Sequence, residues 1–232
     1  MKLYIRKYNI FVGLLTLLVV GAGLATSAVL AQSIGGGGKT AHNAEAGLSD
    51  SQREAIHAAA HAQNNAYLRT FVAQHQDAHE LPVVWVQSWA APPATLQVAA
   101  QAAGTIVLGN VLNVNFAPNP SGALPIATAR VQVARTIKGR AASVITVTQL
   151  GGPVAHGQGG ALAELDADQL ILPGDQVVLL LVPLAADGML RTVQGGGVYF
   201  VRNGVMASEN SEFYKVTGLS LDQFISELVA AR

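Results

Sequence analysis

Apolar and polar positions alternate along much of the second half of the chain. Between residues 128 and 137, Val131, Val133 and Ile137 fall on one face, and polar side chains fall on the other. Successive side chains of a strand point to opposite faces, so this pattern predicts a half-buried β-strand. Further strands are expected at 105–116, 143–149, 176–182, 189–194, 198–202 and 205–207, with 81–89 as a short strand or an extended connector.

Two segments depart from simple alternation. Six consecutive apolar residues, from Val177 to Val182, predict a strand that is covered on both faces. Residues 151–160 include five glycines and a proline, and we expect them to form a loop. Asn203-Gly204 is typical of a tight hairpin turn. Hairpin links with few helices between them favour an antiparallel sheet or barrel, so the predicted fold class is mainly β (α+β).

The chain ahead of the strands has a helical pattern. Residues 49–81 are rich in alanine and histidine and are expected to form a helical arm. Ser51 and Glu54 are spaced as a capping box at its start, and Pro82 follows its end. Residues 82–232 then form the predicted β-barrel-like domain.

Two further helices are expected inside that domain. Thr95 can cap a short helix that runs to Ala103. At the C-terminus, Ser220 and Gln223 form a capping box for a helix over 220–231, which carries an apolar stripe. We expect this stripe to pack against the barrel or sheet.

The N-terminus has the pattern of a membrane-targeting segment. A basic start is followed by a stretch without charge from Ile10 to Ala31, and about 20 residues of helix span a bilayer core. Residues 1–31 are either a signal peptide cleaved near Ala31 or a single-span transmembrane anchor. Both alternatives export the rest of the chain. Residues 32–48 contain four consecutive glycines and predict a flexible linker.

Charge and cysteine content narrow the classes of function. Three of the fourteen basic residues precede the apolar stretch, so the exported part carries three more acidic than basic side chains. Nucleic acid is not an expected partner, because its phosphates require a positive field. The chain has no cysteine, which excludes disulfides, thiolate metal sites and thiol catalysis.

Three segments resemble parts of netrin/TIMP-like OB-fold domains. Residues 102–111 are similar to the opening strand, 131–139 to the second strand with its lysine-glycine turn, and 172–181 to a proline-glycine turn and the following apolar strand. The likeness covers about residues 94–232 and also extends to uncharacterised exported bacterial proteins. It implies an OB-like antiparallel β-barrel with a C-terminal capped helix, and the helical pattern at 49–81 adds an N-terminal helical arm. Metalloproteinase inhibitors of that superfamily act through an N-terminal cysteine, which this chain lacks, so no inhibitory residue carries over.

Four histidines in the helical arm are candidate metal ligands. The two pairs are offset by five helical turns, so an unbroken helix places all four on one side. The candidates are His57, His61, His75 and His79. Two imidazoles four residues apart can bind Zn²⁺ or Cu²⁺, with Glu54 or Glu80 as a third ligand. The alternative is a polar stripe on a surface helix, which the sequence favours because no third ligand is fixed.

The remaining candidate chemistry is weaker. His156 with Ser143 or Ser121 and a downstream carboxylate would form a hydrolase triad, but no serine lies in a nucleophile-elbow motif. The acidic residues Glu164, Asp166 and Asp168 are expected in a solvated edge or turn rather than a Ca²⁺ loop. Trp85 and Trp89 are expected to pack in the core.

Taken together, these patterns predict an extracytoplasmic binding or interaction domain without catalytic activity. Its expected partner is an unidentified protein or another component of the cell envelope, and its N-terminal segment contacts the membrane. A metal-binding exported protein is the alternative, and a hydrolase that uses His156 is a weaker one.

Overall fold

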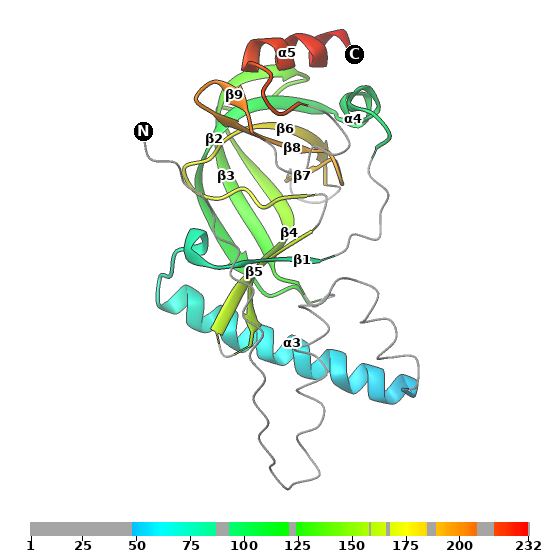
Figure 1. Ribbon diagram of the computed structural model, residues 1–232, viewed down its shortest axis with the longest axis vertical. Coiled ribbons are helices and arrows are strands. Elements are labelled where there is room, and N and C mark those ends of the chain that lie inside the picture. The colour runs from blue at the N-terminus through cyan, green and yellow to red at the C-terminus, as the bar shows by residue number, and fades with distance from the viewer. Residues whose placement is uncertain are drawn as a thin grey trace, which may run out of the picture.

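The computed structural model describes the chain in seven ranges, residues 48–86, 93–120, 124–157, 159–165, 168–184, 189–207 and 216–231. Within them the fold is mainly β, with helices at both ends of a barrel (Figure 1). The predicted targeting segment and nearly all of the predicted linker, residues 1–47, lie outside the described ranges. None of the described helices has both the length and the apolar character that crossing a bilayer requires.

Five strands close into a barrel. They are β2 (Thr105–Ala117), β3 (Ile126–Lys138), β4 (Val144–His156), β6 (Gln176–Pro183) and β7 (Leu190–Thr192). The order is β4-β3-β2-β6-β7, and β7 also pairs with β4. All these pairings are antiparallel except β4 with β7. Closure leaves no long unpaired edge among these strands. The predicted OB-like α+β barrel is therefore confirmed as a fold class.

Strand β6 is covered on both faces, as its run of apolar residues predicted. Val177, Leu179 and Leu181 point into the barrel interior, where they pack with residues of β2, β3 and β4. Val178 and Leu180 point outward into a second cluster beneath the helices that cover this side.

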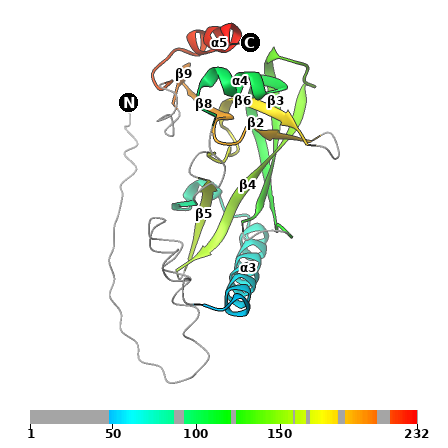
Figure 2. The ribbon, with the colours of Figure 1, turned by 90° about the vertical axis from the view of Figure 1, so that its right-hand side faces the viewer.

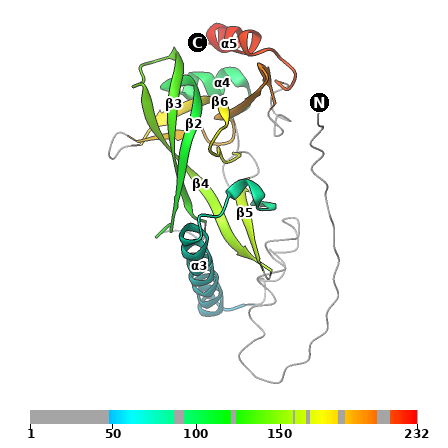
Figure 3. The same cartoon turned by 90° about the vertical axis from the view of Figure 1, so that its left-hand side faces the viewer.

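Two capped helices cover the outer face of β6 and its neighbour β8 (Val198–Arg202). Helix α4 (Leu96–Ala102) begins after Thr95, whose side chain accepts from the amide of Val98. Figures 1 and 3 show α4 close to the C-terminal helix.

The C-terminal helix α5 (Leu221–Ala230) has the predicted capping box between Ser220 and Gln223. Its Phe224 is buried with a ring centroid 4.8 Å from that of Tyr199 on β8. β8 also forms the predicted hairpin with β9 (Val205–Met206).

A small second sheet extends below the barrel. The expected loop at 151–160 is wrong: β4 continues to His156 and pairs with β5 (Gly159–Leu165), which pairs in turn with β1 (Val83–Val86). Gly151 and Gly152 have φ of 131° and 142°, backbone conformations that residues with a Cβ rarely adopt. These glycines let one strand leave the barrel and enter a second sheet, as Figure 2 shows.

Helix α3 (Asp50–Ala73) lies against this extension of β4. It is shorter than the predicted arm, which was expected to reach residue 81. Its capping box is Ser49 with Gln52, not Ser51 with Glu54. The box at Ser49 has a glutamine at the third helical position and satisfies the amides of Ser49 and Gln52, so the helix begins two residues before the predicted box.

A buried cluster explains why the arm stops at Ala73. The chain turns back after the helix, so that Ala78 of the 3₁₀ helix η1 (Ala78–Glu80) packs with Phe71. The same cluster includes Leu162 of β5 and Leu172. A straight helix to residue 81 would leave Ala78 outside this contact.

Candidate functional site: a groove at the end of helix α3

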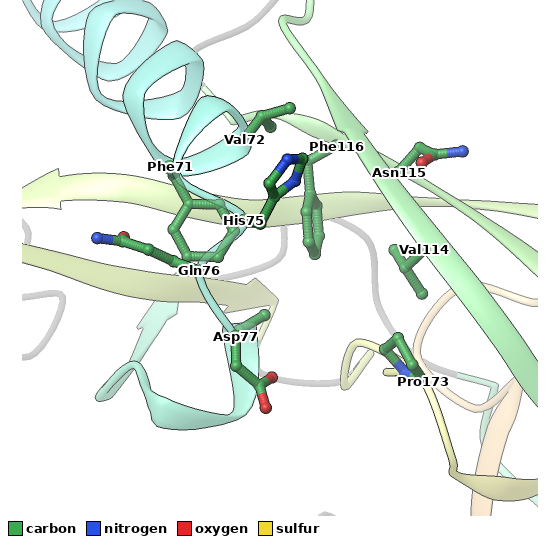
Figure 4. A pocket seen from close by; sticks show the side chains of 10 residues that line it. Phe71, Val72, His75, Gln76, Asp77, Val114, Asn115, Phe116 and Pro173 are labelled. Atoms are coloured by element: carbon green, nitrogen blue, oxygen red, sulfur yellow. The ribbon is translucent and has the colours of Figure 1, made fainter.

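A groove of about 430 Å³ lies between the end of α3 and strand β2 (Figure 4). Most of its wall is apolar or aromatic, with a few polar side chains. The lining residues are Phe71, Val72, His75, Gln76, Asp77, Ala78, Val114, Asn115, Phe116 and Pro173. Ligand sites in proteins are typically concave, largely apolar and have a few placed polar groups, with volumes of about 300–1,000 Å³. This groove fits that description at its lower end.

A β-bulge decides which residues β2 contributes. The pairing of β2 with β3 skips Leu112 between Val111 and Asn113. An extra residue in one strand moves the following side chains to the other face. Leu112 is therefore 48% exposed, while Val114 and Phe116 pack against the cluster beneath α3. A regular alternation along the strand predicted at 105–116 would put Leu112, Val114 and Phe116 on one face, and the bulge separates Leu112 from the other two.

The end of α3 contributes a histidine in a strained backbone conformation. The amide of His75 donates to the carbonyl of Val72 at 3.2 Å, and that of Gln76 donates to Phe71 at 3.3 Å. These two bonds define a Schellman helix end, in which the left-handed position is usually glycine. Here it is His75, with φ 51°. A non-glycine residue in this region is uncommon and costs about 1–2 kcal/mol.

Two phenylalanines form the aromatic part of the groove. The ring centroids of Phe71 and Phe116 are 6.3 Å apart at 75°, an edge-to-face arrangement. Tyr67, one helical turn before Phe71, continues the row at 6.3 Å. His75, whose imidazole is labelled in Figure 4, lines the same groove as these two rings. The groove therefore offers aromatic surface together with an imidazole.

The carboxylate of Asp77 stands on the polar side of the groove (Figure 4). Its Oδ1 accepts from the amide of His79 at 2.9 Å, which caps η1. The side chain of His79 is hydrogen bonded through Nε2 to the carbonyl oxygen of Pro173 at 3.1 Å. This bond ties η1 to the turn before β6, so both walls of the groove are held in place.

A second carboxylate lies behind the same turn. Asp175 accepts a 2.7 Å bond from the amide of Leu172. Burial raises the pKa of Asp175, and the Leu172 amide and the charges of His79 and Arg202 oppose that rise. Asp77 therefore lines the groove, whereas Asp175 lies within the neighbouring 172–175 turn and does not line it.

The four histidines predicted as metal ligands do not share one helix. His57 and His61 belong to α3, whereas His75 follows its end and His79 lies in η1. His61 is hydrogen bonded through Nε2 to the carbonyl oxygen of Asn119 at 2.9 Å. In the part of the chain that the structure describes, no three His, Asp or Glu side chains gather as a metal site. Zn²⁺ or Cu²⁺ binding by these histidines stays a prediction.

The suggested hydrolase residues are far apart. Ser143 directly precedes β4, and His156 is the last residue of that 13-residue strand. At about 3.3 Å per residue, the strand separates them by roughly 40 Å along its path. Ser121 lies outside the described residues.

The acidic residues after β4 are not solvated, which corrects the sequence expectation. Glu164 is 5% exposed and Asp168 is 8% exposed; Asp166 lies outside the described residues. Oδ2 of Asp168 accepts a 2.9 Å bond from the hydroxyl of Thr192 on β7. Burial raises the pKa of Asp168 to about 7, and the Thr192 hydrogen bond opposes this rise. These residues lie where the barrel joins the second sheet, a junction that the sequence does not reveal.

The expectation that the two tryptophans pack in the core is wrong for Trp85, the one that the structure describes. Trp85 on β1 is 45% exposed rather than packed in the core, and Trp89 lies outside the described residues.

Sequence reasoning missed the groove itself. Phe71 lies within the predicted helical arm and Phe116 at the end of a predicted strand, but nothing in the sequence linked the two. Glycine, the usual residue at a helix end, is replaced by His75, so the sequence does not mark the point where α3 ends. Comparison with known proteins adds no further guide, because neither a family model nor a curated protein sequence matches this chain.

Proposed function

We propose that this protein is an extracytoplasmic, non-catalytic binding module, and that it takes apolar side chains of a protein partner into the groove at the end of α3. The observation that carries the proposal is the strained conformation of His75 beside an aromatic groove. Unfavourable backbone conformations persist where the surrounding structure holds them, and they cluster at functional sites. Glycine would remove the strain at this position but would also remove the imidazole from the groove.

Exposed apolar surface beside the groove supports the same function. Val72 of α3 lines the groove and is 47% exposed, whereas the preceding residue, Phe71, is buried. Apolar residues at the rim of a concave aromatic site are typical of surfaces that bind another molecule.

The location outside the cytoplasm is part of the proposal. It rests on the charge-free stretch from Ile10 to Ala31 and its basic flank. The test is an alkaline phosphatase fusion after residue 40, expressed in the native host. Activity of the fused enzyme supports export, and an inactive fusion that remains in the cytosol contradicts it.

Binding can be tested with a blocked pentapeptide, Ser-Leu-Gln-Leu-Ser. The full-length protein is used as the host produces it, in lipid nanodiscs when the apolar stretch is retained, with ¹³C-methyl-labelled valine. Titration should shift the methyl resonances of Val72 and Val114, which line the groove. Val72→Ser should weaken binding about tenfold, since it removes roughly one buried aliphatic side chain from the contact.

Val229→Ser is the matched control, because Val229 is an exposed valine on α5, at the other end of the molecule. It should leave the affinity unchanged. Absence of any shift at Val72 and Val114 up to the solubility of the peptide would contradict binding of apolar side chains in this groove.

A further inference from the structure

We propose that the partner of the groove presents a basic side chain, a lysine or an arginine, between apolar residues of an extended segment. This inference rests on the proposed function and names the chemistry of its partner. Three features of the groove carry it: its aromatic faces, its carboxylate and its carboxamides.

The aromatic rings provide the first feature. Phe116 of β2 is partly exposed in the groove, and the buried ring of Phe71 packs edge-to-face with it at 6.3 Å, so Phe116 supplies the accessible aromatic surface. A cation within about 6 Å of a ring centroid is attracted by the negative face of the ring. Long basic side chains also bury their methylene stems against apolar surface while the charged end stays near water. Val114 and Pro173 supply such surface along the wall.

The charge of the groove provides the second feature. Among the described residues that line it, Asp77 is the carboxylate, and no lysine or arginine is present. Glu80 follows in η1 and is exposed, and Asp175 lies behind the neighbouring turn. Asp77 is itself exposed, so it is open to an incoming charge. A partner with a positive charge complements this arrangement, whereas a negative one is repelled.

The carboxamides of Gln76 and Asn115 provide the third feature, and they favour a peptide over a small amine. Both side chains line the groove. A carboxamide has two donors and an acceptor oxygen, the set that pairs with the N–H and C=O groups of an extended main chain. One N–H of Gln76 already donates to Oε1 of Gln74 at 2.8 Å, which leaves its oxygen and second N–H for a main chain. A simple alkylammonium ion would leave these remaining groups to water and would gain less from the groove.

The experiment compares three blocked pentapeptides, Ser-Leu-Xaa-Leu-Ser, with lysine, glutamine or glutamate in the middle. They are titrated into the full-length protein under the conditions given above, at low salt and pH 7.5. The lysine peptide should bind at least tenfold more tightly than the glutamate peptide, with the glutamine peptide between them. n-Butylammonium chloride is titrated alone and should bind at least tenfold more weakly than the lysine peptide.

Asp77→Asn isolates the charge, because an asparagine oxygen can still accept from the amide of His79 and cap η1. This variant should lose about fivefold in affinity for the lysine peptide and keep its affinity for the glutamine peptide. Asp50→Asn, at the far end of α3, is the matched control and should change neither.

The outcomes separate the two proposals. Equal binding of all three peptides overturns the basic partner but leaves the proposed binding of apolar side chains intact. No binding of any peptide overturns both. Binding of n-butylammonium as tight as that of the lysine peptide overturns the peptide partner in favour of a small amine. An unchanged affinity of Asp77→Asn for the lysine peptide removes Asp77 from the contact and overturns the inference.

Discussion

At the scale of single residues, two residues are held in unfavourable states, His75 by its backbone conformation and Asp168 by the burial of its carboxyl group. His75 occupies a left-handed backbone position next to the groove. Asp168 is a carboxyl buried against Thr192 at the seam of the barrel, and its Oδ1 has no hydrogen-bond partner in the described structure. Both arrangements cost free energy that packing elsewhere offsets. Each therefore gives a prediction in which a substitution stabilises the protein.

His75→Gly should stabilise the fold by about 1 kcal/mol, because glycine adopts φ near 51° without steric cost. Its midpoint in urea should rise, while its affinity for the pentapeptides falls. Asn203→Gly is the control, since asparagine tolerates the same region better and should gain less. A lower urea midpoint for His75→Gly would show that the imidazole supports the fold rather than the groove.

Asp168 should make the protein more stable in mild acid than at pH 8. Burial raises its pKa to about 7 in the folded state, against 3.8 for an exposed aspartate, so the folded state keeps a proton that the unfolded chain has lost. The protonated carboxyl makes its full contribution to the free energy of unfolding below pH 3.8. This contribution, on the order of 4 kcal/mol, is lost as the pH rises to 7. Urea unfolding between pH 4 and pH 8 measures this slope.

Asp168→Asn removes the titrating group and keeps an oxygen that can accept from Thr192. At pH 8 this variant should unfold at a higher urea concentration than the parent. Its free energy of unfolding should also depend much less on pH. Asp175, whose pKa is also raised by burial, leaves a smaller slope of the same sign. Asp222→Asn, in the exposed first turn of α5, should leave the slope as it is; an unaltered slope in Asp168→Asn would refute the assignment.

At the scale of elements, close backbone approaches fix how α3 sits on the second sheet. A Cβ at Gly160 of β5 would overlap the side chain of Tyr67 on α3. The side chain of Asn64 accepts from the amide of Ala155 on β4 at 3.2 Å. These contacts dock α3 on the extension of β4, and the same docking positions Phe71 at the groove.

Gly160→Ala should destabilise the protein by about 1 kcal/mol, because the added methyl displaces the phenol end of Tyr67 from its position against β5. It should also weaken peptide binding, since α3 forms one wall of the groove. Gly159→Ala is an adjacent control with nothing within 4 Å of the new Cβ, and it should be nearly neutral. Thermal unfolding and the peptide titration measure both effects; similar behaviour of the two variants would rule out this docking.

At the scale of the whole molecule, the barrel separates two helical covers. α4 and α5 lie over one side with their own apolar cluster, and α3 lies at the other end (Figure 1). The barrel interior forms a third cluster between them. Substitutions in the α5 cluster should therefore change stability without changing the groove.

Phe224→Ala should cost about 3–5 kcal/mol, because it leaves a cavity next to Tyr199 in a fully buried site. The fraction of protein that stays folded should bind the pentapeptides with unchanged affinity. Val229→Ala, at an exposed position of the same helix, should shift stability by less than about 0.5 kcal/mol. A loss of affinity in folded Phe224→Ala would show that the two ends of the molecule are coupled.

Much of the architecture was predictable because its signals are local. The strand around Val131, the apolar run of β6, the Asn203-Gly204 turn and the capping box at Ser220 are all confirmed. Each is a preference of a short segment that agrees with the global fold. The shared face predicted for Val131, Val133 and Ile137 is wrong for Ile137, which packs in the outer cluster beneath α4 and α5 because the pairing of β3 with β2 shifts register before it. The glycine-rich stretch at 151–160 was misassigned, because the same glycines that favour a loop also permit a strand to bend between two sheets.

The candidate site was not predictable, because it depends on contacts between distant segments and not on local signals. Phe71 and Phe116 meet because a bulge at Leu112 changes the face of β2 and a Schellman turn ends α3 early. The buried state of Asp168 likewise depends on β7 closing the barrel. The sequence by itself determined the strands, the capped helices and the antiparallel class, since these follow from periodicity and chain-local hydrogen bonds. The tertiary structure decided the groove, the strain at His75 and the raised pKa of Asp168, since burial and proximity arise when distant segments pack together.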